Sequence, residues 1–150
     1  MLWSDAEAAI RAYIETQWAL TAYGMIPLVW ENEIAPPQST FIIMTIEGVF
    51  PEKTIFGTTG KRESIEHGLV FYHCFVPTGA GKQTALQPVV AMTGILQLTP
   101  IAAGLNFAGA NPPSPVERGE ATDAFITSAQ PAGVYYRCSG SVPFILITAV

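Results

Sequence analysis

Charged residues are scarce in this chain. Only 13% of its 150 residues are Asp, Glu, Lys or Arg, where about 25% is usual for a soluble domain. A lone subunit with so few charges exposes much neutral or apolar surface, which favours an oligomer whose subunit contacts cover that surface. The alternative is a neutral monomer rich in Thr, Gly and Pro.

Cations are the scarcer of the two kinds of charge. Seven Lys and Arg stand against twelve Asp and Glu, for a net charge of -5. They are spread from Arg11 to Arg137, and Lys61-Arg62 is the only adjacent pair. Tight nucleic-acid binding depends on cations set against phosphates, so this distribution argues against it. An acidic surface still suits a passage through which DNA slides without sticking.

Cysteine is nearly absent, with two residues in the whole chain. Two are too few for a disulfide framework. Cys74 and Cys138 both lie in apolar, strand-like runs, so we expect buried free thiols rather than a bridge.

No targeting or membrane-spanning segment is predicted. The N-terminus leads directly into a helix pattern rather than a signal peptide. The charge-free tract 83–116 is largely apolar, but Gln, Pro and Gly interrupt it, and its flanks lack basic clusters and an aromatic belt. We therefore expect a soluble cytoplasmic protein without a membrane contact.

The most informative stretch runs from residue 57 to 84. It opens with a Gly/Thr turn that carries Lys61 and Arg62, continues as a long strand to Val76, stops at Pro77, and passes a Gly-rich corner into an apolar helix. After Gly68 the side chains on both faces of the strand are apolar. This predicts that the second half of the strand is covered on both faces. The first half should project into solvent or toward a neighbour, and Gly68 could mark a bulge.

The flanking segments predict two helices and further strands. A capping-box pattern at Ser4 and Glu7 predicts the start of the first helix. The predicted helices cover Asp5–Tyr23 and about 15 residues from Lys82 toward Leu98; the other predicted strands cover 26–30, 40–48, 49–57, 116–128 and 134–149. This order indicates an α+β fold, with a small mixed or antiparallel sheet, an N-terminal helix and a second helix packed on it. Residues 1–150 are expected to form a single domain.

No catalytic, cofactor-binding or metal site is predicted. The corner before Lys82 lacks two defining P-loop residues, because Val76 and Gln83 occupy their places. His67 and His73 are six residues apart on one strand, about 20 Å, too far to share a metal ion. We expect a surface His67 and a packed, hydrogen-bonded His73. No serine lies in a nucleophile-elbow pattern.

Three short motifs occur in a familiar order. The first is a P-x-V-W-x-N step, present here as Pro27-Leu28-Val29-Trp30-Glu31-Asn32, and the second is a G-x4-R-x5-G passage that matches Gly57, Arg62 and Gly68. The third is a strand that closes in V-x-P-x-G-x-G, although here Pro77 directly follows Val76. With the N-terminal helix and the C-terminal β structure, this order resembles the siphophage tail-terminator family and its prophage relatives. The loop around 111–115 has no counterpart that we can place in that family.

The resemblance implies a structural virion protein. Such proteins form a homo-hexameric ring that caps the finished tail tube, stops tube polymerisation and presents the surface that joins the head. The implied partners are other copies of the chain, the tail-tube protein and the head-tail connector, with DNA passing through the lumen without specific binding. The implied location is the virion tail or neck, after assembly in the host cytoplasm.

Charged residues near the turn of the long strand are the predicted contacts between subunits. The candidates are Lys53, Lys61, Arg62, Glu63 and Glu66. An ordinary solvated hairpin is the alternative for these charges.

Two other functions stay open from the sequence. One is a different neck protein, such as a head-closure or tail-tube subunit, because these also form rings from small β-rich domains. The other is a small-molecule binding domain, which should contain a large apolar pocket with a few convergent polar groups.

Overall fold

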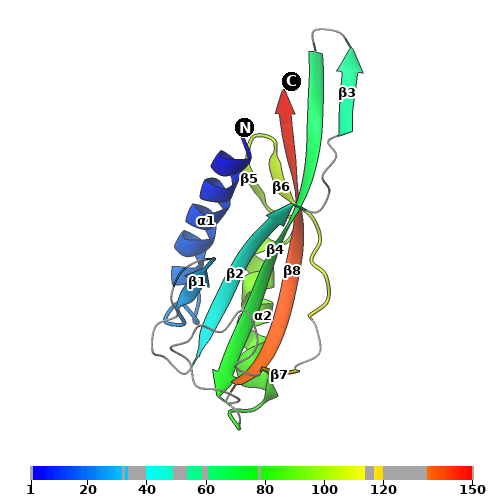
Figure 1. The fold of residues 1–150 in the computed structure, drawn as a ribbon. Helices are drawn as coiled ribbons and strands as arrows, with labels where there is room; N and C mark the ends of the chain where they lie inside the picture. Colours follow the sequence, from blue (N-terminus) through cyan, green and yellow to red (C-terminus); the bar gives the residue numbers. More distant parts are fainter. Residues whose placement is uncertain are drawn as a thin grey trace.

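The computed structural model shows an α+β fold in which two helices pack on one curled, mixed sheet (Figure 1). The structure describes residues 2–31, 33, 40–48, 54–58, 61–77, 79–113, 117–119 and 135–149. The order of strands along the sheet is β1-β2-β4-β8-β6-β5, with β3 paired to β4 and β7 paired to β8. The α+β prediction is therefore confirmed.

Two long antiparallel strands form the centre of the sheet. They are β4, Lys61–Pro77, and β8, Tyr135–Ala149. Their register is unbroken from Glu63 opposite Ala149 to Pro77 opposite Tyr135. The long central strand expected from the sequence is therefore present, although it begins at Lys61, within the predicted turn, and includes Pro77, where it was expected to stop.

Shorter strands extend the sheet on both sides of this pair. On the β4 side are β2, Phe41–Gly48, and β1, Leu28–Trp30, which is parallel to β2. On the same side of β4, but further along it, lies β3, Thr54–Thr58. On the β8 side are β5, Pro100–Ala102, β6, Leu105–Phe107, and β7, Glu117–Gly119.

The main hydrophobic core lies between the helices and one face of the sheet. Even-numbered residues of β4 and β8 point into it, because alternate side chains of a strand share a face. Val70, Tyr72, Cys74, Val142 and Phe144 are all buried there. A smaller cluster on the opposite face is made by Val29, Phe41, Ile43 and Phe75. The prediction that the second half of β4 is buried on both faces is confirmed for Cys74, Phe75 and Val76.

The N-terminal helix α1, Trp3–Ala19, packs its apolar stripe on this core. Ile10, Ile14 and Trp18 are buried, as their helical spacing predicts. The predicted capping box is wrong, because Leu2 is the N-cap and no side chain caps the helix. The Glu7 carboxylate instead accepts a hydrogen bond from Trp3 Nε1 at 2.8 Å.

The second helix α2, Lys82–Leu96, follows the glycine corner as predicted. Gly79 and Gly81 have φ angles of 96° and 94°, which glycine adopts without strain. The helix begins at Lys82 and continues through Pro88. No helix in the described part of the chain is both long and apolar enough to cross a membrane.

Gly68 is not a bulge, because the register of β4 with β8 continues unbroken through it. The ring of Phe144, its partner on β8, lies over the glycine instead, and an added Cβ would come within 2.2 Å of the ring. The same arrangement recurs with the roles of the strands exchanged, since the ring of Tyr72 lies over Gly140. These glycines leave room for two large rings directly over the central strands.

Candidate subunit interface

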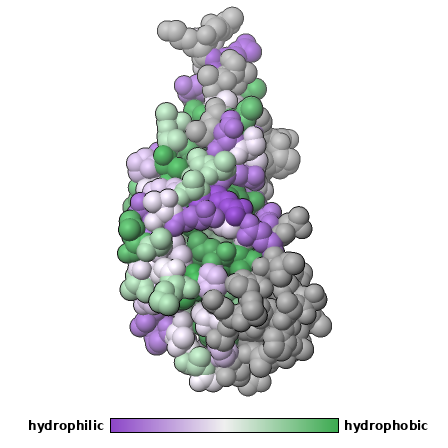
Figure 2. All heavy atoms as spheres, turned by 90° about the vertical axis from the view of Figure 1, so that its left-hand side faces the viewer, coloured by the Kyte–Doolittle hydropathy of each residue, from purple (hydrophilic) through white to green (hydrophobic). Residues whose placement is uncertain are grey.

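One part of the sheet extends past the body that the helices cover (Figure 1). We call it the arm, and it consists of β3 with residues 61–65 of β4, flanked on the other side by residues 147–149 of β8. In Figure 1 it rises beyond the N-terminal end of α1 and the β5–β6 hairpin. Figure 2 shows it from the α1 side as a narrow extension above the broad body. The expectation that the first half of the central strand projects is confirmed.

The predicted interface charges that the structure describes lie on the arm or just below it. Arg62 and Glu63 are exposed, and Glu66, just below the arm, is half-buried. For Lys61 only the backbone is described, opposite Thr58 at the start of β4. Lys53 lies outside the described residues.

Register places an apolar and a cationic side chain together on one face of the arm. Ile55 pairs with Ser64, and Gly57 pairs with Arg62. Because residues 62 and 64 of β4 share a face, Ile55 and Arg62 are diagonal neighbours about 7–8 Å apart. Ile55 is 57% exposed, as are several other large apolar side chains among the described residues. Sequence inspection singled out the charges but missed Ile55, because the pairing of β3 was unknown.

The outer edge of β3 has no strand partner among the described residues. Within the described part of the chain, β3 pairs only with β4. An open edge offers unpaired backbone N–H and C=O groups to another strand. The arm therefore combines an open backbone edge, an exposed isoleucine and exposed charges.

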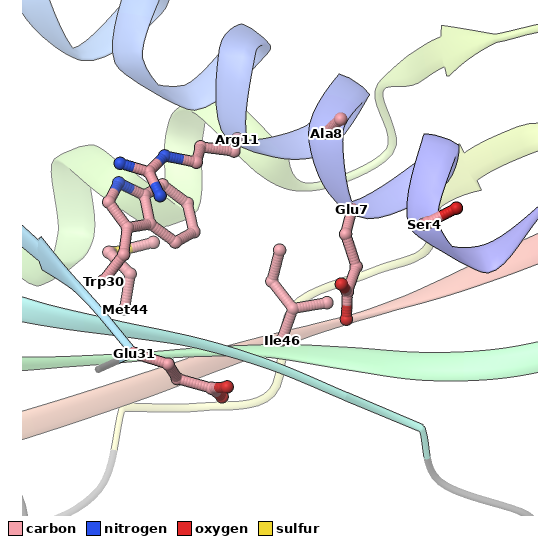
Figure 3. A pocket seen from close by; sticks show the side chains of 8 residues that line it. All are labelled: Ser4, Glu7, Ala8, Arg11, Trp30, Glu31, Met44 and Ile46. Atoms are coloured by element: carbon pink, nitrogen blue, oxygen red, sulfur yellow. The ribbon is translucent and has the colours of Figure 1, made fainter. Parts of the chain in front are cut away.

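A second feature lies on the body, between α1 and the sheet edge formed by β1 and β2. It is a groove with a volume of about 310 Å³ (Figure 3). Its lining residues come from the first three turns of α1, the end of β1 and the middle of β2: Ser4, Glu7, Ala8, Arg11, Trp30, Glu31, Met44 and Ile46. Figure 3 shows Ile46 on its floor, with Glu7 pointing down from the helix.

Beside this groove, part of the edge of β2 has no strand partner in the part of the chain that the structure describes. Strand β1 pairs only with residues 42–44 of β2. Among the described residues, no strand pairs with residues 45–48 on that side. An extended segment could therefore continue the line of β1 and pair with β2.

One wall of the groove is formed by Arg11 stacked on Trp30. The Arg11 guanidinium carbon lies 5.1 Å from the centre of the Trp30 ring. Arg11 also donates to Glu15 Oε1 at 3.0 Å and to Glu33 Oε1 at 2.7 Å. The hydrogen bond to Glu33 is the main reason why the pKa of Arg11 is raised. The carboxylates of Glu15 and Glu33 neutralise this cation. The groove is therefore acidic, because it also carries the carboxylates of Glu7 and Glu31.

Trp30 carries a buried donor without an acceptor. Its side chain is almost fully buried, and its Nε1 has no hydrogen-bond partner among the described residues. The indole nitrogen lies beside the Arg11 guanidinium (Figure 3), which cannot accept a hydrogen bond. An unmade hydrogen bond at a buried donor costs about 1–3 kcal/mol, so an incoming acceptor would be favoured.

The groove could not be found by sequence inspection. Its walls come from α1 and from β1 and β2, which are separated in the sequence, and no motif joins them. The one local signal was Trp30 in the P-x-V-W-x-N step. A tryptophan beside two glutamates at a strand end is compatible with many environments, so it predicted no groove.

The two histidines do not form a metal site. His73 Nδ1 is hydrogen-bonded to Ser139 Oγ at 2.6 Å, so His73 is the packed, hydrogen-bonded residue expected from the sequence. No group of three or more His, Cys, Asp or Glu side chains within the described segments could hold a metal ion.

The two cysteines are free and buried, as predicted. They lie directly opposite each other on β4 and β8. Burial raises the pKa of Cys74 to about 12 and also raises the pKa of Cys138. Both thiols are therefore protonated and unreactive near neutral pH.

The fold and its surfaces define an α+β protein with a projecting β arm and a separate groove at the sheet edge. No family model matches the chain, and no curated protein matches it. Among solved structures, the chain is similar to a protein whose name states no function, with a TM-score of 0.64 at 12% sequence identity. The similarity covers 97% of this chain and 96% of that one. It shows a shared fold.

Proposed function

We propose that this protein is a tail-completion protein of a siphophage or related prophage, which forms a ring on the end of the tail tube. As a terminator, the ring would end tube polymerisation and present the surface that joins the head. The proposal rests on the order of sequence motifs and on one structural observation. That observation is the arm, which extends beyond the helix-covered body with Ile55, Arg62 and Glu63 exposed on it.

A projecting arm suits a ring better than a monomer. Exposing the apolar side chain of Ile55 to water costs free energy, and an unpaired strand edge promotes aggregation. A subunit contact that covers both would remove these penalties. In a head-to-tail ring each subunit offers one surface and receives a different one, and the ring closes when the rotation permits. The arm can be the offered surface. The low content of charged residues is consistent with further burial between subunits.

The experiment that tests the proposal is the solution mass of the purified protein by light scattering, with negative-stain images of the same sample. We expect closed rings of about six subunits, either free or on added tail tubes. Rings on the ends of length-limited tubes would support a terminator. Long cylinders of the protein itself would indicate a tail-tube subunit instead, and a monomer that ignores tube ends would contradict the proposal.

The charge-reversal variant Arg62→Glu tests the contribution of the arm. Arg62 is exposed, so the fold should be unchanged, which circular dichroism can verify. Ring formation should decrease, because the side chain would no longer match its acceptor on the next subunit. Unchanged assembly would remove Arg62 from the predicted interface.

A small-molecule binding role is the second candidate, and the groove is the observation that favours it. Its volume of about 310 Å³ is at the lower limit for ligand sites. Its lining mixes two acidic side chains with apolar ones, whereas a typical ligand site is mostly apolar.

A further inference from the structure

We propose that the groove between α1 and the open edge of β2 receives the arm of a second copy of this chain. The inference rests on the proposed function, because a head-to-tail ring needs a receiving surface different from the arm. Three properties of the groove match the arm: its shape, its charge and its unused hydrogen-bonding groups.

The shape matches because both partners are strand edges that have an apolar residue beside them and no strand partner within the described segments. The outer edge of β3 has no partner among the described strands, and neither have residues 45–48 of β2 on the side that faces the groove. Pairing the two edges would continue the sheet from one subunit into the next, as in β-strand addition. Ile55 would then enter the groove against Ile46, where about 310 Å³ is enough for a side chain of this size.

The charges are also complementary. Arg62 is on the same face of the arm as Ile55, by the register of β3 with β4. The groove carries Glu7 and Glu31, whereas its one cation, Arg11, is already bound by Glu15 and Glu33. An arm that places Ile55 on the groove floor brings Arg62 near these two carboxylates. Opposite charges across an interface favour the correct register and partner.

The groove also contains unused hydrogen-bonding capacity. The Trp30 Nε1 donor is buried without an acceptor among the described residues. A carboxylate or backbone carbonyl of the arm could accept from it once the Arg11 guanidinium moves aside. The backbone groups of β2 beyond residue 44 would gain strand partners in the same step.

Cross-linking tests the contact directly. In one chain, position 55 is opposite residue 64 of β4 and position 46 is opposite residue 70. These positions are six residues apart along the strand, or about 20 Å. A double variant Ile55→Cys/Ile46→Cys, treated with a bifunctional maleimide much shorter than this separation, should give a ladder of covalent oligomers. Each single variant should give none, and Cys74 and Cys138 should not react because they are buried.

A steric block supplies the matched control. Ala8 is exposed and lines the groove, whereas Ala12 is exposed one turn further along α1 and does not line it. Ala8→Arg should raise the concentration needed for half-assembly at least roughly tenfold, as expected for blocking the centre of an interface. Ala12→Arg adds the same side chain to the same helix and should assemble like the wild type.

Mixing two defective proteins identifies the head-to-tail arrangement. Ala8→Arg keeps its arm but loses its groove, and Ile55→Asp keeps its groove but loses its arm. Each alone should be monomeric, and an equimolar mixture should form heterodimers but no rings, because only one productive contact is left. Rings formed equally well by Ala8→Arg would overturn this contact and leave the proposed function in place. A wild type that forms no ring, free or on tube ends, would overturn both.

Discussion

At the scale of single residues, two glycines decide how the central strands pack. Gly68 leaves room for the ring of Phe144, and Gly140 leaves room for the ring of Tyr72. The Phe144 ring is further fixed by Trp3 at 5.6 Å and Phe107 at 5.9 Å between ring centres. It therefore has little freedom to move away from a larger residue at position 68.

Gly68→Ala should lower the free energy of unfolding by about 1–3 kcal/mol, the usual cost of overpacking a core. The added methyl would be 2.2 Å from Phe144 Cζ. Gly94→Ala is the matched control, because it lies in α2 with nothing within 4 Å of an added Cβ. That variant should be more stable by roughly 0.5–1 kcal/mol. Urea denaturation measures both, and equal stability of the two variants would contradict the packing described here.

The buried thiol of Cys74 predicts a loss of stability at alkaline pH. Its pKa is raised by burial from 9.0 to about 12, so the unfolded chain loses this proton at lower pH than the folded one. The contribution of this thiol to the free energy of unfolding should be fully present below pH 9. Between about pH 9 and 12 it should be lost, by roughly 1 kcal/mol per pH unit. Burial also raises the pKa of Tyr72, which acts in the same direction.

Cys74→Ala separates the contribution of the thiol from that of the tyrosine. The variant should be less stable near neutral pH, because a buried group is removed. Its free energy of unfolding should then decline less steeply above pH 9 than that of the wild type. Parallel declines, measured by urea denaturation across this pH range, would show that the thiol does not titrate as its burial requires.

At the scale of elements, the two halves of the central strand β4 differ in how many other elements pack against them. Residues 68–75 of β4 lie between β2 and β8, and α2 covers one face. The arm half pairs with the short strand β3 and the last residues of β8. Local stability should follow this difference.

Hydrogen exchange should therefore separate the halves in the unassembled protein. The amides of β3 and of residues 61–65 should exchange much faster than those of residues 70–75, which should approach the rate set by global unfolding. Assembly should slow exchange in the arm, and in the β2 edge if the groove receives it. Slow exchange in the arm of a verified monomer would contradict the view that the arm lacks a partner there.

The sequence predicted most elements because their patterns are local. The helix pattern over Asp5–Tyr23 predicted α1, although α1 ends at Ala19, and the apolar run after Gly68 predicted the covered half of β4. The predictions that failed depended on partners distant in the sequence. Glu7 pairs with the Trp3 indole rather than with a helix cap, and the ring of Phe144 explains Gly68. The groove was missed for the same reason, since tertiary packing alone brings α1 to the β2 edge.

At the scale of the whole molecule, the charges are few and mostly negative. The chain has a net charge of -5, and a ring multiplies this charge by the number of its subunits. The one cation described at the groove, Arg11, is held by Glu15 and Glu33. Because acidic residues outnumber cations in every copy, the net field of the molecule repels phosphates.

The assembled protein should consequently not bind DNA measurably. Attraction between a protein and DNA comes mainly from Lys and Arg that displace counterions, and it is strongest at low salt. We expect no change in the fluorescence anisotropy of a short labelled duplex, even at an ionic strength where the screening length is about 30 Å. Binding that weakens steeply with added salt would reveal a cationic surface that the net charge conceals. The absence of DNA binding would fit a passage through which DNA moves without being held, because an acidic wall repels the duplex.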